Sequence, residues 1–575
     1  MHRWPFRRIW LIDFEYNALP GENPDVVCLV AWELRTGQKI RLSQDQLKQS
    51  LPPFSVGRDH LFVSFTFTAE GSCFLALDWP LPDNILDLYV EFRCLTNDLW
   101  PFAGNGLIGA LAYFGLPSIS VGEKETMRAL IMSGGPWDEE QKAKILAYCE
   151  SDVDALFRLL PVMAPKIDLP RALLRGKFMG YCARVEAAGI PIDVPSYRRL
   201  ARHWDSVEDE LIHKINLDYY RPYREKQFRH AIFEWYLVRY GISWPRTSSG
   251  RLDLRVETFE RMSGLYPQLI PLMELRKTLG QMHLKELPIG RDGRNRFSIR
   301  PFAARTSRNQ PRAKEFILGS AAWLRGLIKP EPGRGIGYID YEQQEFGIGA
   351  AISGDELMQA AYLSADPYLT LAEDAGVVPR GATKQSHPQE RVLFKELVLA
   401  TQYGVGARTF AERIKRSSVE AERLIENHKR RYKKFWEWSD GAVRYAALHG
   451  HLWSPFGWVR HYRNMNEESA RNFPIQACGA EMLRLAIMLG LDAGVRISGP
   501  LHDGLTVEFV LEEEEETIWK MRTAMKQASQ VVLAGFSLRT DIMVVRYPER
   551  FMHDRGKPMW DLIWTIIDQI EKGNL

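Results

Sequence analysis

The sequence contains few cysteines and no strong excess of charge. Only 6 of its 575 residues are cysteine and no two form a CxxC pair, so we expect neither a zinc site nor a disulfide framework. The formal net charge of +3 is small, so any surface for nucleic acid has to be local. The N-terminal stretch MHRWPFRRIWLIDFE has no signal-peptide core, and no apolar run reaches membrane-spanning length. These absences predict a cytoplasmic protein with no membrane partner.

The rest of the composition is that of ordinary folded domains. Apolar residues make up 45% of the chain and charged residues 26%. The length exceeds what one hydrophobic core can organise, so we expect roughly three to five domains or subdomains. One stretch, HKRRYKKFWEW (His428–Trp438), interleaves cations with rings. This pattern suits nucleic-acid phosphates and bases, and a solvated helix face is the alternative.

The segment Gly335–Asp355 places an acid at the end of a predicted strand. Ile336–Ile339 is apolar and β-capable, Asp340 follows, and Phe346 and Gly349 come next at helical spacing. A carboxylate held by a strand end is well placed to bind a divalent cation. Taken alone, this segment also fits an acid that only caps a turn or helix.

A second acid lies at the tip of a predicted hairpin far downstream. Ile497–Glu508 has two β-like runs joined at His502-Asp503-Gly504. If the two aspartates come together, they could hold two Mg²⁺ ions for phosphoryl transfer.

Between the two acids lies RVLFKELVLATQYG, in which selected side chains recur every four residues. They are Arg391, Lys395, Leu399 and Tyr403. A helix aligns them on one face, which suits a nucleoside triphosphate. For each residue alone, a solvated cation or a core side chain is the alternative.

These three segments resemble motifs A, B and C of the family A DNA polymerases, the group of the bacterial polymerase I large fragment. DYEQQE resembles the family's DYSQIE, the RVLFKELVLATQYG stretch resembles R-x3-K-x7-YG, and His502-Asp503 resembles HDE. The resemblance covers nearly the whole chain, without the family's separate 5′-nuclease domain. It implies a template-directed DNA polymerase for replication or repair, associated with a nucleoid or replicon. Its partners would be primer–template DNA and dNTPs, and nothing in the sequence identifies a processivity factor or helicase–primase.

The resemblance also implies roles for individual residues. Asp340 and Asp503 would be catalytic and, with the carbonyl of Tyr341, would hold two Mg²⁺ ions, with Mn²⁺ as a substitute. The dNTP-binding residues would be Glu345, which excludes ribonucleotides, and Arg391, Lys395, Leu399, Tyr403 and Gly404. Two positions depart from the family: Leu399 replaces its Phe or Tyr, and Gly504 replaces the Glu of HDE.

Two further segments resemble DNA-contacting parts of the family. Ala303–Pro311 is similar to a shortened TGRLSSTDPNLQN, and Glu467–Glu481 is similar to ERAAINAPMQGTAAD. On these matches and the HDE match, the DNA-binding residues would be Arg305, Asn309, Asn472, Gln476 and His502.

Residues 1 to about 165 read as an α/β unit with a second group of acids. Asp13 and Glu15 share one face of a predicted strand, and Tyr148 and Asp152 share one face of a predicted helix, Gln141–Leu160. Such a group could bind two metals and orient a water for phosphodiester hydrolysis. Caps and surface acids are the alternative.

This region resembles the DEDD-type 3′–5′ exonuclease domain that precedes the polymerase in the family, in its tyrosine variant. Its catalytic residues would be Asp13, Glu15, Glu70, Tyr148 and Asp152, and the four acids would be metal ligands. Glu70, which follows the short β-rich run Leu61–Phe67, stands where the family has Asp. Asp87 is the alternative for that position, with a structural role as its expected one.

The expected fold class is α/β and α+β: an RNase H-like exonuclease domain followed by a right-hand polymerase. The boundaries are 1–165 and 166–575, with thumb about 200–300, palm about 301–354 and 439–575, fingers about 355–438, and a linker around 161–173. Within the thumb, the helical stretch Glu257–Leu287 carries Arg276, Lys277 and Lys285 for DNA phosphates, or is a solvated helical pair. One alternative function is a 3′–5′ exonuclease with a non-catalytic, DNA-binding polymerase-like half. Another is a single-subunit RNA polymerase or primase.

Overall fold

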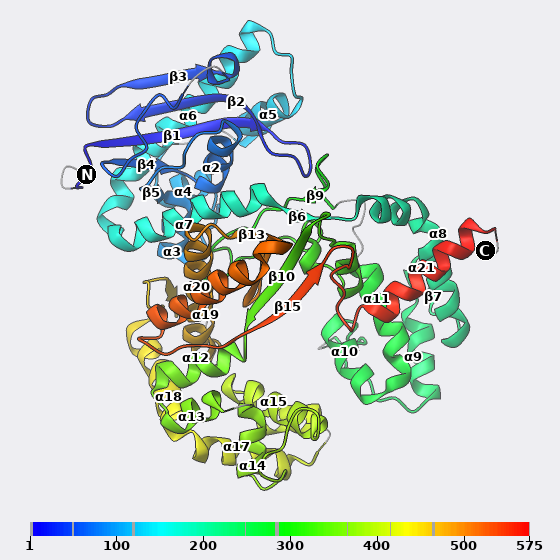
Figure 1. Ribbon diagram of the computed structural model, residues 1–575. Helices are drawn as coiled ribbons and strands as arrows, with labels where there is room; N and C mark the ends of the chain where they lie inside the picture. Colours follow the sequence, from blue (N-terminus) through cyan, green and yellow to red (C-terminus); the bar gives the residue numbers. More distant parts are fainter. Residues whose placement is uncertain are drawn as a thin grey trace.

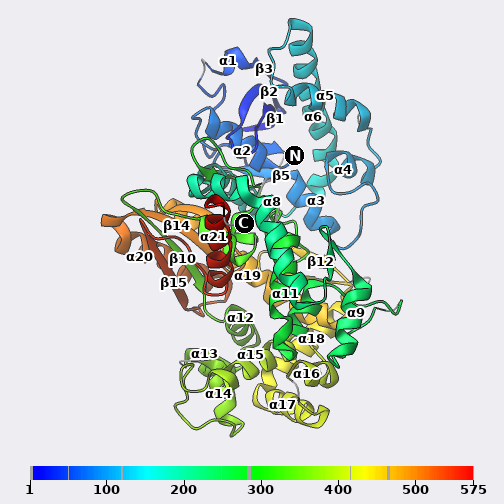
Figure 2. The ribbon, with the colours of Figure 1, turned by 90° about the vertical axis from the view of Figure 1, so that its right-hand side faces the viewer.

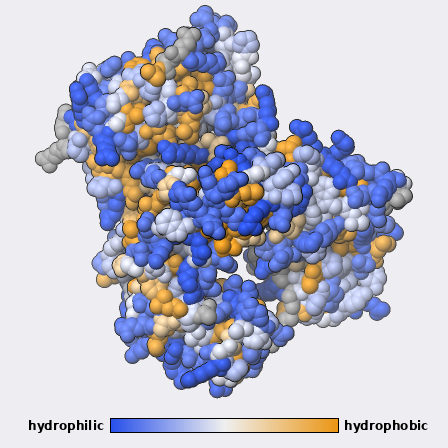
Figure 3. All heavy atoms as spheres, in the orientation of Figure 1, coloured by the Kyte–Doolittle hydropathy of each residue, from blue (hydrophilic) through white to orange (hydrophobic). Residues whose placement is uncertain are grey.

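The structure is a mixed α/β molecule built around a central antiparallel sheet. The computed structural model describes residues 4–48, 51–117, 121–247, 249–281, 287–364, 366–414, 416–462 and 466–573. Figure 1 shows an N-terminal unit above the sheet, a helical lobe to its right and a second helical lobe below it. We call these parts the N-terminal unit, the right lobe and the lower lobe. Figure 3 shows that the surface is hollowed between the right and lower lobes.

The N-terminal unit contains a five-stranded sheet in the order β3-β2-β1-β4-β5. β1 pairs antiparallel with β2 and parallel with β4. The strands are β1 (Arg8–Asn17), β2 (Asp25–Glu33), β3 (Lys39–Ser43), β4 (His60–Ser64) and β5 (Ile85–Asp87). The strand expected to reach Phe67 ends at Ser64, because Thr66 has a left-handed backbone (φ 79°) and Phe67 begins the helix α2. Glu70 therefore lies in the first turn of a helix.

Helices cover this sheet and connect it to the rest of the molecule. They are α1 (Gln44–Leu47), α2 (Phe67–Ala76), α3 (Leu88–Thr96), α4 (Leu107–Tyr113), α5 (Val121–Met132), α6 (Glu139–Met163) and α7 (Leu169–Ala188). The linker expected around 161–173 is shorter than predicted: α6 continues through Pro161, and only residues 164–168, which include the 3₁₀ turn Ala164–Lys166, separate it from α7. Buried Leu159, Leu160 and Met163 hold the last turn of α6 in the core.

The central sheet has the order β13-β14-β10-β15. Its strands are β10 (Arg334–Tyr341), β13 (Arg496–Leu501), β14 (Gly504–Val510) and β15 (Thr540–Arg546). The expected strand–turn–helix and hairpin are both confirmed: β10 leads to α12 (Gln344–Ser353), and β13 turns at residues 502–503 into β14. Two long helices, α19 (Glu467–Asp492) and α20 (Glu514–Val532), pack on this sheet. Among the described residues α19 alone has the length and apolar composition of a membrane span, but 72% of its most apolar window is buried, so it is a core helix.

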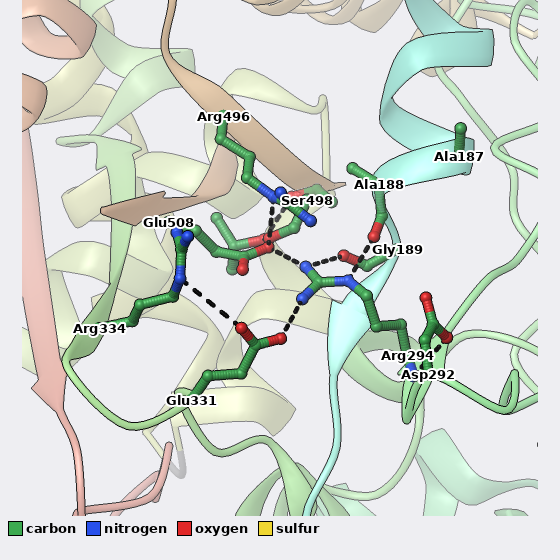
Figure 4. Close-up of polar contacts among 12 residues, drawn as sticks. Ala187, Ala188, Gly189, Asp292, Arg294, Glu331, Arg334, Arg496, Ser498 and Glu508 are labelled. Atoms are coloured by element: carbon green, nitrogen blue, oxygen red, sulfur yellow. Dashed lines mark hydrogen bonds and ion pairs between the residues drawn. The ribbon is translucent and has the colours of Figure 1, made fainter. Parts of the chain in front are cut away.

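A buried ion-pair network joins the central sheet to the end of α7 (Figure 4). Arg294, on the short strand β9 (Arg294–Asn295), pairs with the buried Glu508 of β14 and with Glu331 at 2.9 Å. The same guanidinium donates to the carbonyls of Ala188 and Gly189, where α7 ends. One side chain thus ties together a helix end, a strand and a loop.

The right lobe consists of helices and a small hairpin, β7 (Tyr223–Arg224) and β8 (Gln227–Phe228). Its helices are α8 (Val194–Asp218), α9 (His230–Arg239), α10 (Val256–Leu265) and α11 (Ile270–Gln281). Arg276 lies 4.3 Å from the ring centre of Phe228 and 4.6 Å from that of Phe259, so it faces the core of the lobe and not a DNA phosphate as expected. Lys285 and the side chain of Lys277 lie outside the described residues.

The lower lobe and its return to the sheet are helical. The elements are α13 (Glu356–Leu363), α14 (Pro367–Asp374), α15 (Pro388–Gln402), α16 (Ala407–Ile414), α17 (Ser418–Arg431) and α18 (Lys433–His449), followed by the hairpin β11 (His451–Trp453) and β12 (Val459–His461). His428, Tyr432 and Phe435 of the ring-rich stretch are fully buried. The rings of that stretch therefore build the core between α17 and α18, which favours the solvated-helix alternative for its cations.

Candidate functional site

Asp340 and Asp503 lie together at one edge of the central sheet. Asp340 is paired in register with Gly504, the first residue after the hairpin tip. The backbone N–H of Tyr341 donates to the carbonyl of Asp503 at 3.3 Å. Burial, followed by the charges of Asp503 and Asp541, raises the pKa of Asp340 to about 6. Burial also raises the pKa of Asp503. Two half-buried carboxylates that repel each other fit a site that a divalent cation would complete.

Glu345 stands next to this pair at the start of α12. Its carboxylate lies 3.3 Å from the guanidinium of Arg308, and burial raises its pKa despite that cation. The charge of Arg308 also offsets part of the rise that burial causes in the pKa of Asp503. The sequence analysis singled out Arg305 and Asn309 but missed Arg308, because three arginines in the stretch ARTSRNQPR look alike without their partners.

The helix α15 aligns Arg391, Lys395 and Leu399, as the four-residue spacing predicts. Tyr403 caps the helix, and Gly404 follows with φ of 76°, so the last two residues of the motif lie outside the helix. Arg391 is not free: it pairs with Asp366 and lies 5.5 Å from the ring centre of Tyr368. The charge of the exposed Lys395 opposes the rise that burial causes in the pKa of Asp503, so this charge reaches the aspartate pair.

The expected DNA-binding residues lie in three places. Asn309 and His502 line one cavity of about 300 Å³ together with Arg308. Asn472 and Gln476 lie on α19, and the side-chain oxygens of Asn309 and Asn472 are buried without a partner among the described residues. Buried acceptors are normally hydrogen-bonded, so these two oxygens are suited to accept a hydrogen bond from a ligand. Arg305 instead faces the N-terminal unit, where it pairs with Asp98 at 2.8 Å.

The N-terminal unit holds a separate group of acids. Carboxylate oxygens of Asp13, Glu15 and Asp152 lie within 4.8 Å of one another, which makes this the one such group that could hold a metal ion among the described residues. Burial first, then neighbouring charges including Asp152, raises the pKa of Glu15 to about 9. Burial raises the pKa of Asp152, and the charge of Lys124 and a hydrogen bond that Tyr148 donates partly offset that rise. Lys124 of α5, which the sequence analysis missed, lies 3.3 Å from Asp152.

Glu70 and Asp87 lie beside this group but outside it. One oxygen of Glu70 accepts the backbone N–H of Phe14 at 3.0 Å, and burial and the charge of Asp13 raise its pKa. Both oxygens of Asp87 accept backbone N–H groups, from Phe67 at 2.6 Å and from Val90 at 3.0 Å. Asp87 therefore caps α3 and holds the start of α2, as its expected structural role requires.

Comparisons with known proteins agree on one family. The family model described as DNA polymerase family A matches residues 317–545. The chain is 26% identical to "DNA polymerase I" of Aquifex aeolicus over 420 residues, which is 69% of this chain and 71% of that protein. It is 25% identical to "DNA polymerase" of Mycobacterium phage L5, over 82% of this chain and 81% of that protein. Among solved structures, the "POL domain of Pol1 from M. smegmatis complex with DNA primer-template and dNTP" matches with a TM-score of 0.66 at 18% identity and covers 94% of this chain and 95% of that one. At 18% identity, the match to this solved structure shows a similar fold and nothing more.

Proposed function

We propose that this chain, a member of DNA polymerase family A through its residues 317–545, is a template-directed DNA polymerase that adds dNTPs to a primer 3′ end. The observation that carries the proposal is the pairing of Asp340 with the hairpin that bears Asp503, inside the matched region. The relatives are named as DNA polymerases, and the similar solved structure holds primer–template DNA and a dNTP. The domain boundaries of the thumb, palm and fingers belong to the same proposal.

Asp340, Asp503 and the carbonyl of Tyr341 are the groups that would hold divalent cations. Two Mg²⁺ ions bound there would lower the pKa of the primer 3′-OH and neutralise the triphosphate. Lys395 is exposed and so is ready to bind a phosphate. Arg391 has to exchange Asp366 for the triphosphate, which couples nucleotide binding to a movement of α15.

Primer extension tests this proposal. Asp340→Ala should slow extension by about a thousandfold or more, because a lost ligand costs several kcal/mol of transition-state stabilisation. Glu512→Ala removes an exposed acid just beyond β14 and serves as the control, with extension unchanged. Normal extension by Asp340→Ala would refute the assignment of Asp340, whereas a parent chain that extends no primer would favour the alternative of a non-catalytic polymerase-like half.

Glu345 is the proposed barrier to ribonucleotides. Its half-buried carboxylate, held by Arg308 next to Asp503, leaves a 2′-OH without room or a good partner. Glu345→Ala should raise kcat/KM for a matched rNTP more than it lowers that for the dNTP, measured in an exonuclease-deficient background. An unchanged ratio would remove this role and reopen the RNA-synthesis alternative.

We also propose a 3′–5′ exonuclease, with an RNase H-like fold, in residues 1–165. The support is the group of Asp13, Glu15 and Asp152 with Tyr148 beside it. Asp13→Ala with Glu15→Ala should stop degradation of a single-stranded 3′ end, whereas extension continues because its acids lie on another sheet. If Glu70→Ala keeps full degradation and Asp87→Ala loses it, the second acidic position belongs to Asp87.

A further inference from the structure

The loop between α3 and α4 exposes two large aromatic side chains. Trp100 is 68% exposed and Phe102 is 90% exposed. Burying a large aromatic side chain stabilises a protein, and these two rings stay exposed to water. Exposed apolar groups of this kind mark a binding surface. Neither ring takes part in the catalytic groups described above.

This loop is anchored to the central part of the molecule. The amide of Asn97 donates to the carbonyls of Arg305 and Val459, both at 2.8 Å. The carboxylate of Asp98 pairs with Arg305 and with Arg460, again at 2.8 Å each. Figure 2 shows α3 and β12 at the junction of the N-terminal unit with the rest of the chain. The rings are therefore presented at that junction on a fixed base.

One cation lies against Trp100, and two more lie near that cation. The guanidinium of Arg305 lies 4.9 Å from the ring centre of Trp100. Arg93 and Arg300 are close enough that the charges of Arg300 and Arg305 add to burial in lowering the pKa of Arg93. The Nε of Arg93 is buried and has no hydrogen-bond partner among the described residues. With Asp98 shared between Arg305 and Arg460, positive charge remains in excess, which suits a phosphate backbone.

The helix α3 connects the exposed loop to the region of the acids in the N-terminal unit. α3 begins at its cap Asp87, whose charge acts on Glu70, and its 9 residues span about 14 Å before the loop. Tyr89 and Arg93 lie four residues apart and so share one face of α3. The ring of Phe65 lies 5.9 Å from that of Tyr89. Rings and cations therefore follow one helix from the acids to the exposed loop.

We propose that Trp100 and Phe102, with Arg93, Arg300 and Arg305, bind single-stranded DNA and guide its 3′ end along α3 toward Asp13, Glu15 and Asp152. Stacking on rings requires unpaired bases, because a duplex hides the base faces inside its stack, while the arginines hold the phosphates. This inference rests on the proposed exonuclease function, for which it names the surface that receives the unpaired strand. A protein partner for the two rings is the competing occupant.

Fluorescence anisotropy with a labelled single-stranded oligodeoxynucleotide tests the proposal. The full chain carries Asp13→Ala and Glu15→Ala so that the probe survives, and a duplex of the same sequence is measured in parallel. Trp100→Ala and Phe102→Ala should each raise Kd for the single strand about fivefold or more, with a smaller change for the duplex. Trp519→Ala is the matched control, because Trp519 is 66% exposed on α20 and outside this loop. Phe102→Trp keeps a ring and should bind as the parent does.

The outcomes separate this inference from the function on which it rests. If Trp100→Ala and Phe102→Ala leave the Kd for the single strand unchanged, the inference is wrong. The two rings would then be a binding surface for a protein partner. An equal loss for single strand and duplex would also overturn it, because the rings would then not read unpaired bases. With Asp13 and Glu15 restored, the ring variants should degrade a single-stranded 3′ end more slowly. If that chain degrades nothing but still needs the rings to bind the strand, the exonuclease fails and the binding surface stands.

Discussion

Gly504 shows why the hairpin tip differs from the HDE motif that it resembles. A Cβ on Gly504 would lie 2.8 Å from the Cβ of Asp340, from the carbonyl of Ile339 and from the hydroxyl of Tyr338. Tyr338 thus fills space that a side chain at this position would need. The glutamate of the family motif cannot be restored here without moving β10, which holds the catalytic Asp340 of the proposed mechanism.

Gly504→Ala should therefore lower stability by about 1–3 kcal/mol through overpacking and reduce primer extension by displacing Asp340. Thermal unfolding and extension rates measure the two effects. Gly441→Ala is the control, because Gly441 lies inside α18 with no atom within 4 Å of the added Cβ. Alanine there should be neutral or stabilise by up to about 1 kcal/mol. A stable, fully active Gly504→Ala variant would contradict the packing argument.

The network around Arg294 shows how one buried cation joins separate elements. Burial raises the pKa of Glu508, and the positive charge of Arg294 opposes this rise more than any other neighbouring charge does. Arg294→Met should destabilise the protein by about 3–5 kcal/mol, because it leaves Glu508 buried without its partner. Arg294→Met combined with Glu508→Leu should recover much of that loss. Chemical unfolding measures both variants.

The control for this pair is Arg334→Ala. Arg334 lies 3.6 Å from Glu331 and both side chains are partly exposed, so its removal should cost at most about 1 kcal/mol. If Arg294→Met were no worse than Arg334→Ala, the network would not support the junction of α7 with the central sheet.

His428 links the stability of α17 and α18 to pH. Its Nδ1 accepts the indole N–H of Trp436 at 3.2 Å, and its Nε2 is buried without a partner among the described residues. Burial, assisted by the charge of Lys429, lowers the pKa of His428 to about 3. An unfolded histidine takes up its proton near pH 6.5 and the folded one does not. The contribution of neutral His428 to the free energy of unfolding is therefore complete above pH 6.5 and is lost as the pH drops toward 3.

Between pH 6.5 and pH 5, the loss from His428 should be about 2 kcal/mol. His428→Gln keeps an acceptor for Trp436 but cannot gain a proton, so its stability should change less over this range. Hydrogen exchange of peptides from α17 and α18, compared between the two proteins at each pH, measures the difference. Parallel pH dependence in both proteins would exclude His428 as the cause.

The C-terminal helix α21 (Lys557–Glu571), for which the sequence indicated no role, packs against α8 of the right lobe and against the 3₁₀ turn Ala322–Leu327. Its acids Asp568 and Glu571 pair with Arg199 of α8 at 2.5 and 2.6 Å. Just before it, the N–H of Phe551 donates to the carbonyl of Ile328 at 2.9 Å. Figure 1 shows α21 lying along the right lobe. The helix thus limits how α8 can move relative to the sheet.

Ile566→Ala, a change at a fully buried position of α21, should cost about 2–5 kcal/mol and speed hydrogen exchange in α8. Gln569→Ala changes an exposed position of the same helix and should alter stability by no more than about 0.5 kcal/mol. Unchanged exchange in α8 with Ile566→Ala would mean that α21 packs there without restraining the lobe.

Local patterns in the sequence determined the elements that carry the proposed chemistry. The apolar run before Asp340 and the turn at Asp503 predict a strand end and a hairpin tip, and both are observed. The four-residue spacing from Arg391 to Tyr403 predicts a helix face, which is observed as far as Leu399, with Tyr403 as the cap. Hydrophobic periodicity and turn preferences act over a few residues, so they can be read from the chain directly. The resemblance to a family then supplied the pairing of Asp340 with Asp503.

Only the tertiary structure decided which partners the side chains have. Arg391 pairs with Asp366, Glu345 with Arg308 and Asp152 with Lys124, each across a turn or between separate elements. Arg276 turned toward rings of its own lobe, where its sequence had suggested a DNA phosphate. An ion pair or a ring contact forms between residues that packing brings within a few ångströms, whatever their separation along the chain. Because that packing depends on how every element fills the space beside its neighbours, no local pattern records it.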